Sequence, residues 1–356
     1  MPTRISRGRS LPLDLFVDEA VFGLEARQIW DRDWVFATPL DAVAEPGDFV
    51  AVTIGAQPII VVRGQDLELR ALANVCRHRG MPLVDGSGQA KRFPCPYHAW
   101  TYGNDGALQS VPYTMPDEIS VADHHLAEYR CEVWHGLVFV NLDPDAEPLA
   151  DRLSIVDPYV RPLAIDRLHH DVASTGIEEW QANWKVIHAN AIDAYSQFRV
   201  HAETIEPISP TDGSYYLAGS AMATVTGGES LERADHLVIA IPPSFVAVIY
   251  PDAMLWQSIT PLAVDRSLVR VGLAAERIDD GVAVNLPGWD ARFLDEDRAI
   301  CERLQRNARA RSEPGALTAM ERALGDFHEY LAWRLTEVLP SEPFVAARPG
   351  ERPEPD

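Results

Sequence analysis

The sequence predicts an α+β protein of two domains, an all-β domain followed by a domain in which an antiparallel sheet packs against helices. Three observations support this class. With 356 residues, 47% of them hydrophobic, the chain can bury the cores of two domains. Short β-branched runs separated by Gly, Pro and Asp turns fill residues 41–141. Beyond them, strands are grouped between helices without regular βαβ alternation.

Four blocks are expected along the chain. Residues 17–34 repeat apolar side chains near a period of 3.6 and predict a helix, so that 1–37 form a helical region packed on the second domain. Residues 38–150 form the β domain and residues 151–343 the second domain. The tail, 344–356, is Pro-rich and charged and is expected to be disordered.

The second domain is expected to contain both strands and helices. Strands are predicted near 168–178, 214–225, 236–242, 244–250 and 254–275. Helices are predicted near 180–196, 289–310 and 316–338. This order favours an antiparallel sheet with helices packed against it.

Charge and hydropathy exclude two classes of partner. Lys and Arg number 31 against 53 Asp and Glu, and the net charge of -22 repels nucleic acids and anionic membranes. Near the N-terminus, LPLDLF is too short for a secretion signal and is interrupted by Asp14. The longest apolar run, 237–250, contains two prolines and is shorter than a bilayer span. A cytoplasmic protein is expected.

Two cysteines have a histidine at ligand spacing. Cys76-x-His78 is followed, after sixteen residues, by Cys95-x-x-His98. Two thiolates on one iron and two imidazoles on the other describe a Rieske-type 2Fe-2S cluster. The alternative is a Cys2His2 zinc site, which takes the same ligands. Zinc fingers usually pair Cys with Cys, whereas each motif here carries one Cys and one His, and the Rieske interpretation is favoured.

With this motif, from about residue 15 to about residue 340, the chain resembles the catalytic (alpha) subunit of the Rieske non-haem iron oxygenases. This family includes aromatic-ring-hydroxylating dioxygenases and demethylases. The resemblance implies an inserted all-β Rieske domain, a helix-grip catalytic domain, a 2Fe-2S cluster and a mononuclear Fe(II). Ala99 stands where the family usually has Gly. No G-x-G-x-x-G follows a strand, so a separate ferredoxin or NAD(P)H-dependent reductase is implied.

A second stretch, Asn183–His201, is similar to the family motif N-W-K-x3-E-N-x2-[DE]-x-Y-H-x4-H, which carries iron ligands. Ala189 replaces the usual Glu, and Ser196 replaces the first ligand histidine. The resemblance implies that His201 is a metal ligand. On a helix, His188 would point away from Asp193, so it is expected to be a packed or surface histidine rather than a substitute ligand.

The resemblance also assigns catalytic roles to Asn190 and Asp193. In the family, the carboxylate at Asp193 links the Rieske histidine of a neighbouring subunit, here His98, to an iron-ligand histidine. A head-to-tail homotrimer is therefore implied. Because the onward partner of Asp193 is here Ser196, electron delivery is expected to be slower.

The carboxylate ligand is expected on a late helix. In residues 291–306, Asp297 shares the apolar stripe that includes Phe293 and Cys301, while Asp295 and Glu296 are predicted to face elsewhere. A buried carboxylate needs a positive partner, which a ferrous ion supplies. The family motif selects the same residue. The alternative is a structural Asp297 paired with an Arg.

A complete site of this type has two histidines and one carboxylate. With Ser196 at the missing-ligand position, affinity for Fe(II) is expected to fall. Three interpretations stay open. The enzyme works with two residues or recruits another donor, such as Gln197; the chain is a silent subunit of a mixed trimer or an electron carrier; or the histidine was replaced deliberately.

The substrate is expected to be a small, largely apolar organic molecule, hydroxylated or oxidatively demethylated with O2. The sequence does not choose between these reactions. Residues expected to line the pocket, or else to belong to the core, are Tyr215, Tyr216, Met222, Phe245, Tyr250 and Trp256. Other histidines, His236 among them, lack a partner at ligand spacing and are expected to be structural or solvated.

Overall fold

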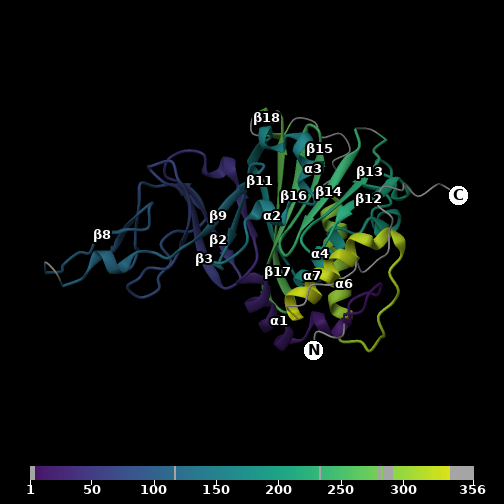
Figure 1. Ribbon diagram of the computed structural model, residues 1–356, viewed down its shortest axis with the longest axis horizontal. Helices are drawn as coiled ribbons and strands as arrows, with labels where there is room; N and C mark the ends of the chain where they lie inside the picture. Colours follow the sequence, from purple (N-terminus) through teal and green to yellow (C-terminus); the bar gives the residue numbers. More distant parts are fainter. Residues whose placement is uncertain are drawn as a thin grey trace. The chain divides into compact units, whose positions relative to one another are not determined.

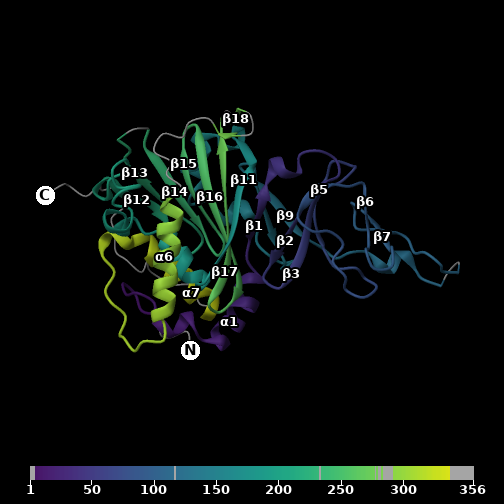
Figure 2. The ribbon, with the colours of Figure 1, turned by 180° about the vertical axis from the view of Figure 1, so that it is seen from behind.

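The computed structural model describes residues 5–115, 118–231, 234–276, 278–279, 282–283 and 292–336. The chain divides into two compact units, Trp30–Leu149 and a larger unit made of Met1–Ile29 with Ala150–Asp356. Figures 1 and 2 show both units from opposite sides. The expected tail, 344–356, lies outside the described residues. Within the described residues, no helix is long and apolar enough to cross a membrane.

The smaller unit is all-β, as predicted. Its seven-stranded sheet has the order β1-β10-β9-β4-β3-β2-β5, and a three-stranded sheet has the order β6-β7-β8. All the pairs are antiparallel. The strands are β1 (Val35–Pro39), β2 (Asp48–Ile54), β3 (Gln57–Arg63), β4 (Leu69–Ala73), β5 (Ser87–Gln89), β6 (Arg92–Pro94), β7 (Thr101–Gly103), β8 (Leu108–Ser110), β9 (Glu128–Trp134) and β10 (Leu137–Asn141).

The larger unit is built on a seven-stranded antiparallel sheet of order β11-β17-β16-β15-β14-β13-β12. Its strands are β11 (His169–Trp180), β12 (Ser214–Gly219), β13 (Thr224–Gly228), β14 (His236–Ile241), β15 (Phe245–Tyr250), β16 (Ala253–Ala263) and β17 (Arg266–Ala275). The short strands β18 (Ile278–Asp279) and β19 (Val282–Ala283) pair separately. Each predicted strand region contains strands, but 214–225 is divided between β12 and β13, and 254–275 forms the two paired strands β16 and β17. The α+β class is confirmed.

Helices pack against this sheet (Figure 1). Helix α4 contacts β15 and β16, helix α7 contacts β12 and β13, and helix α6 packs on α4. The helices are α1 (Glu19–Glu25), α2 (Leu149–Arg152), α3 (Asp157–Val160), α4 (Trp184–Ala191), α5 (Gln197–Val200), α6 (Arg292–Asn307) and α7 (Arg322–Thr336). A π-helical turn, Ala26–Trp30, continues α1. Short 3-10 turns lie at Leu13–Phe16, Leu40–Val43, Val121–His124, Arg161–Leu163, Ile165–Arg167, Ala194–Ser196, Thr211–Gly213 and Ala319–Glu321.

The start of α4 is fixed by buried polar contacts. Asn183 caps the helix, because its side-chain oxygen accepts from the Lys185 backbone N–H at 3.0 Å. The Lys185 ammonium forms a fully buried ion pair with Glu25 of α1 at 2.7 Å, and the Trp184 indole donates to the same carboxylate at 2.8 Å. These contacts hold one end of α4 and explain the Asn-Trp-Lys part of the motif.

The single helix predicted over 180–196 is wrong. Helix α4 ends at Ala191, and a separate 3-10 turn, Ala194–Ser196, leads into α5. The cause is Asp193, whose carboxylate accepts a hydrogen bond from the Tyr195 backbone N–H at 3.0 Å and so caps the new turn. A short acidic side chain competes in this way with the helical hydrogen bonds of the backbone.

Candidate redox and metal sites

Two loops of the smaller unit carry the Cys/His motifs, and both close in the same way. The Gly80 N–H donates to the Cys76 carbonyl at 2.8 Å, and the Ala99 N–H donates to the Cys95 carbonyl at 2.9 Å. Both closing residues have positive φ, 77° at Gly80 and 57° at Ala99. Because only glycine adopts this region without strain, the structure explains why the family usually has Gly at the position of Ala99.

The four side chains form an inner and an outer pair. The thiols of Cys76 and Cys95 are buried among the core residues of the β domain. The rings of His78 and His98 lie 4.7 Å apart, and His98 is exposed. The His78 Nδ1 atom is buried and has no hydrogen-bond partner. Paired thiols inside, paired imidazoles outside and an orphaned ring nitrogen fit a 2Fe-2S cluster with two sulfur and two nitrogen ligands.

Aromatic side chains surround the ligand pairs. Trp100 stacks on His78 with a centroid distance of 4.9 Å and an interplanar angle of 4°. The Tyr102 hydroxyl accepts from the Arg77 backbone N–H at 3.0 Å and lies 3.5 Å from the Cys76 Sγ. Its own hydrogen is therefore available to Sγ. Hydrogen bonds to cluster sulfurs are one of the means by which a protein sets the reduction potential.

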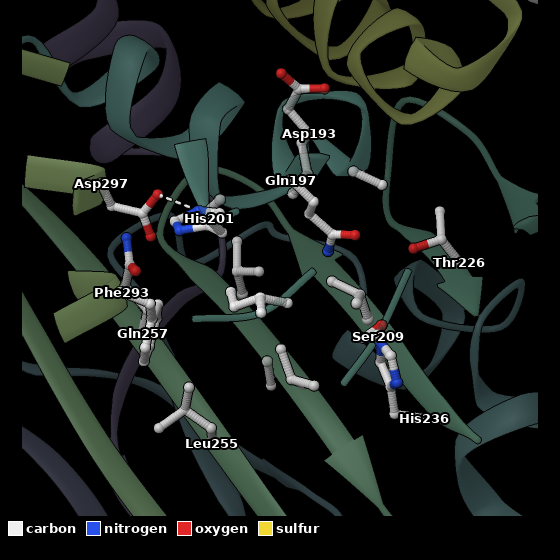
Figure 3. A pocket seen from close by; sticks show the side chains of 18 of the residues that line it. Asp193, Gln197, His201, Ser209, Thr226, His236, Leu255, Gln257, Phe293 and Asp297 are labelled. Carbon is white, nitrogen blue, oxygen red and sulfur yellow. Dashed lines mark ion pairs between the residues drawn. The ribbon is translucent and has the colours of Figure 1, made fainter. Parts of the chain in front are cut away.

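In the larger unit, His201 and Asp297 meet at one end of a cavity (Figure 3), and Asn190 contacts Asp297 there. His201 follows α5, Asp297 lies on α6 and Asn190 lies near the end of α4. The His201 Nε2 atom is 3.1 Å from the Asp297 Oδ1 atom. The Asn190 side-chain amide donates to the same oxygen at 2.6 Å. The structure thus brings together the two candidate ligands and fixes the carboxylate through Asn190.

Glu296 also belongs to this site, although the sequence analysis expected it to face elsewhere. Its Oε2 atom lies 2.8 Å from His201 Nδ1 and accepts from the Thr204 hydroxyl at 2.6 Å. Since a carboxylate only accepts, Nδ1 carries a proton, and Nε2, which also faces a carboxylate, would exchange its proton for a metal. A carboxylate behind the ligand histidine is a common feature of metal sites. Both acids also raise the pKa of His201, against the opposing effect of its burial.

The donor set fits a mononuclear iron in part. One imidazole nitrogen and one carboxylate face a cavity, which is two thirds of a two-histidine, one-carboxylate site. Within the described residues, no third His, Cys, Asp or Glu side chain completes a metal-binding group at this site. His188 lies fully buried with its ring 4.4 Å from that of Phe327, outside the cavity wall, as expected of a packed histidine.

Ser196 does not occupy the missing-ligand corner. Its hydroxyl donates to the Asp193 carbonyl at 2.9 Å, and it is absent from the cavity wall. The next residue, Gln197, does line the cavity, and its Oε1 atom is buried with no hydrogen-bond partner (Figure 3). Burial, with a smaller contribution from Glu321, raises the pKa of Asp193 to about 6.

The cavity has a volume of about 180 Å³ and is bounded by α4, α5, α6 and strands β13 to β17. Of the six residues expected to line it, Tyr250 alone belongs to the wall. Phe245 and Trp256 are buried on the opposite face of the sheet, because their strand neighbours Val246, Leu255 and Gln257 face the cavity. The Tyr216 hydroxyl instead donates to Asp326 at 2.8 Å. Ser209 and His236, which the sequence analysis did not assign to the pocket, line it.

Two domain families match this chain. The Rieske [2Fe-2S] domain covers residues 33–130, and the catalytic domain of ring hydroxylating alpha subunits covers residues 213–337. These domains indicate a 2Fe-2S cluster in the first and a mononuclear iron in the second. The family resemblance, the fold class and these two cofactors are therefore confirmed.

Curated relatives match over part of their length. The oxygenase subunit of glycine betaine monooxygenase from Chromohalobacter salexigens is 33% identical over 204 residues, 57% of this chain and 45% of that protein. The large oxygenase component of naphthalene 1,2-dioxygenase from Pseudomonas putida is 36% identical over 199 residues, 53% of this chain and 43% of that protein. The chain thus spans about half the length of the curated relatives it matches.

Solved structures show the same fold over nearly the whole chain. A quaternary ammonium Rieske monooxygenase in complex with L-carnitine superposes with a TM-score of 0.79 at 23% identity, covering 94% of this chain and 96% of that one. Naphthalene 1,2-dioxygenase with indole bound in the active site gives a TM-score of 0.81 at 22% identity, covering 93% of both chains. With both domains matched in this order, the chain combines a Rieske [2Fe-2S] domain with the catalytic domain of ring hydroxylating alpha subunits and is homologous to Rieske oxygenase large subunits.

Proposed function

We propose that the protein is the oxygenase component of a Rieske system, which hydroxylates or oxidatively demethylates a small organic substrate. Dioxygen is the oxidant, and a separate ferredoxin or reductase supplies the electrons. The observation that carries this proposal is the contact of His201 with both Asp297 and Glu296 at the end of a cavity. In a protein without a metal-dependent activity, a buried imidazole between two carboxylates would have no evident role.

Different residues would hold the cluster and the mononuclear iron. Cys76, His78, Cys95 and His98 would hold the cluster, which supplies single electrons when bound. His201 and Asp297 would hold the mononuclear iron, which activates dioxygen when bound. Asn190 keeps the Asp297 carboxylate in place by its 2.6 Å hydrogen bond. Glu296 keeps the proton of His201 on Nδ1, so that Nε2 stays directed at the metal position.

The route of the electrons would run between subunits of a head-to-tail homotrimer. His98 is exposed, so it is available to a neighbouring subunit, while Asp193 lines the cavity and is partly buried. Asp193, with its pKa near 6, could take up or release a proton near neutral pH. Its side chain contacts the backbone N–H of Tyr195, and the onward contact with an imidazole at 196 is replaced by Ser196.

Whether the protein is active or silent depends on what supplies the third ligand of the mononuclear iron. Gln197, rather than Ser196, projects a buried and unpartnered oxygen into the cavity, one turn before His201. An amide oxygen is a weaker ligand for Fe(II) than an imidazole, so the site would bind iron more loosely than a complete triad. We propose Gln197 as the third donor of the active form.

A second candidate function is that of a silent subunit or electron carrier in a mixed trimer. It is favoured by the contact of the Ser196 hydroxyl with the Asp193 carbonyl, which leaves no side chain of residue 196 at the metal position. In this case the cluster would be intact and the second site empty. A cytoplasmic location remains an expectation for either function.

Metal analysis separates the two functions. The purified chain, reconstituted with Fe(II) and sulfide under argon, is expected to hold about three irons, two of them in the cluster. Two irons, with no product from a reductase-coupled assay, would support the silent subunit. Zinc alone would remove both functions.

Ser196→His provides the second arm of this test. A gain in iron content and in product would show that Ser196 is the cause of weak iron binding and low activity. Unchanged values, together with a loss of iron in Gln197→Ala, would support Gln197 as the donor. Ser154→Ala, an exposed serine outside the cavity, is the control.

A further inference from the structure

Two buried polar side chains line the cavity without serving the metal site. Ser209 and His236 are 3% and 5% exposed. The Ser209 hydroxyl oxygen and the His236 Nδ1 atom have no hydrogen-bond partner in the described part of the chain. Buried polar groups are nearly always paired, so an unpaired hydroxyl and an unpaired imidazole in one pocket wall suggest a missing partner.

The fold fixes the backbone at Ser209 and the ring of His236. The Ser209 backbone N–H donates to the Ile205 carbonyl at 2.8 Å in the turns that follow His201. The His236 ring packs over Gly228 of the neighbouring strand, where a Cβ would lie 2.4 Å from the ring. On its other side it lies 5.2 Å from the ring of Tyr250. A glycine beneath the ring leaves the space that the imidazole occupies.

The two residues lie away from the metal corner. Figure 3 shows Ser209 and His236 in one part of the pocket and His201 and Asp297 in another. Most of the remaining wall is aliphatic, and its members include Ile205, Ile208, Val238, Val246, Leu255 and Leu273. A ligand that fills this cavity would therefore meet an apolar wall with a polar group at the end remote from the metal.

The charges in the wall restrict the ligand further. Burial lowers the pKa of His236 to about 4, so its ring is neutral near pH 7 and offers one donor and one acceptor. No Lys or Arg is among the described residues of the wall. A substrate carboxylate, such as that of a betaine, would find no Lys or Arg there and would face Asp193 and Asp297, two acids of the wall. A neutral hydroxyl or carbonyl would satisfy Ser209 and His236 without bringing in a charge.

The volume gives the size of the ligand. The cavity measures about 180 Å³, and an apolar cavity of about 150 Å³ in another protein binds benzene. We propose that Ser209 and His236 form an anchoring subsite for a neutral hydrogen-bonding group, and that the substrate is an uncharged molecule of about one ring carrying one such group. The apolar part of this substrate would then face His201 and Asp297. This substrate class rests on the proposed oxygenase function.

The test is a comparison of two matched probes, toluene and benzyl alcohol. Their dissociation constants are measured by calorimetry on the full chain without reductant, so that no turnover occurs. The ratio of the toluene constant to the benzyl alcohol constant is then compared between variants, which cancels their different hydrophobicities. One neutral hydrogen bond corresponds to a change of roughly threefold to tenfold in this ratio.

Ser209→Ala and His236→Phe are each expected to lower the ratio by that factor. His236→Gln, which keeps a hydrogen-bonding side chain, is expected to retain part of the preference and carries the test if the Phe variant does not fold. Ser154→Ala and His188→Phe are the controls, since neither residue lines the cavity. His188 is a matched control because both of its ring nitrogens are also buried and unpartnered.

Three results would overturn the inference. The first is an unchanged ratio in both Ser209→Ala and His236→Gln, and the second is no binding of benzyl alcohol to the unmodified chain. The third is binding of glycine betaine more tightly than benzyl alcohol. Failure of the proposed oxygenase function is measured separately. A chain without its mononuclear iron but with the expected ratios contradicts only the oxygenase function, whereas product formation with an unchanged ratio contradicts only the subsite.

Discussion

The cluster site and the mononuclear site differ in how the chain builds them. The four proposed cluster ligands lie on two short loops within one small domain, and each loop is closed by its own backbone hydrogen bonds. The mononuclear site takes Asn190 from α4, His201 from the end of α5, and Glu296 and Asp297 from α6. A site made of loops can be recognised by spacing, whereas a site made of separate helices depends on how they pack.

The largest expected effect is at the cluster. Cys95→Ala removes a buried thiolate ligand, so the chain is expected to lose its 2Fe-2S cluster and most of its iron and labile sulfide. Visible absorption and electron paramagnetic resonance of the reduced protein measure this loss. Cys131→Ala, in the same domain but outside both loops, is the control. A cluster that survives in Cys95→Ala would contradict the assigned ligands.

Glu296→Gln is expected to have the next largest effect, on the mononuclear site alone. Gln keeps the size of the side chain but weakens the hold on His201 Nδ1, and changes behind a metal ligand typically cost about tenfold to a hundredfold in affinity. Fe(II) affinity of the second site is expected to fall by that factor, while the cluster spectrum stays the same. Fe(II) titration against a competing chelator measures it. Glu203→Gln, an exposed residue near His201, is the control, and equal affinities in both variants would reject the role of Glu296.

The two sites also differ in how much of them could be predicted from sequence. The four proposed cluster ligands could all be named from spacing, because their loops need no distant element. Asp297, the proposed carboxylate ligand, was selected from the apolar stripe of its helix. Glu296 was not selected, because its partners His201 and Thr204 come from another segment. An acid next to the stripe can still reach across to a neighbouring helix.

The pocket wall was predicted poorly for a related reason. Strand β15 is apolar on both faces, so alternation along FVAVIY does not tell which face the helices cover. The bulky Phe245 and Trp256 were chosen for size, yet the smaller Val246 and Leu255 face the cavity. The break after α4 was missed because the capping role of Asp193 was hidden by its expected place in the catalytic motif.

A smaller effect is expected from Asp193→Asn. The pKa of Asp193 is raised to about 6 in the folded chain, so ionisation is harder there than in the unfolded chain. The carboxylate therefore lowers the free energy of unfolding above about pH 6. This effect becomes small as the pH falls to the ordinary pKa of 3.8 and vanishes well below it, where the group is protonated in both states. Asn, which stays neutral, is expected to raise the free energy of unfolding at pH 7.5 by about 1–2 kcal/mol.

Urea unfolding of Asp193→Asn at pH 7.5 and pH 4 measures this difference. Asp212→Asn, at an exposed position, is the control and is expected to change little at either pH. An equal change in stability at both pH values would show that the effect of Asp193→Asn does not arise from the raised pKa.

The smallest effect tests the backbone of the cluster loops. Ala99 has φ of 57°, whereas the equivalent closing residue of the other loop is already a glycine, Gly80. Ala99→Gly relieves a left-handed conformation that costs a residue with a Cβ about 1 kcal/mol, so it is expected to raise the free energy of unfolding by about that amount. Ala107→Gly, in the same domain at a position without positive φ, is expected to lower it. Should both variants destabilise the domain, the positive φ at Ala99 would not be a source of strain.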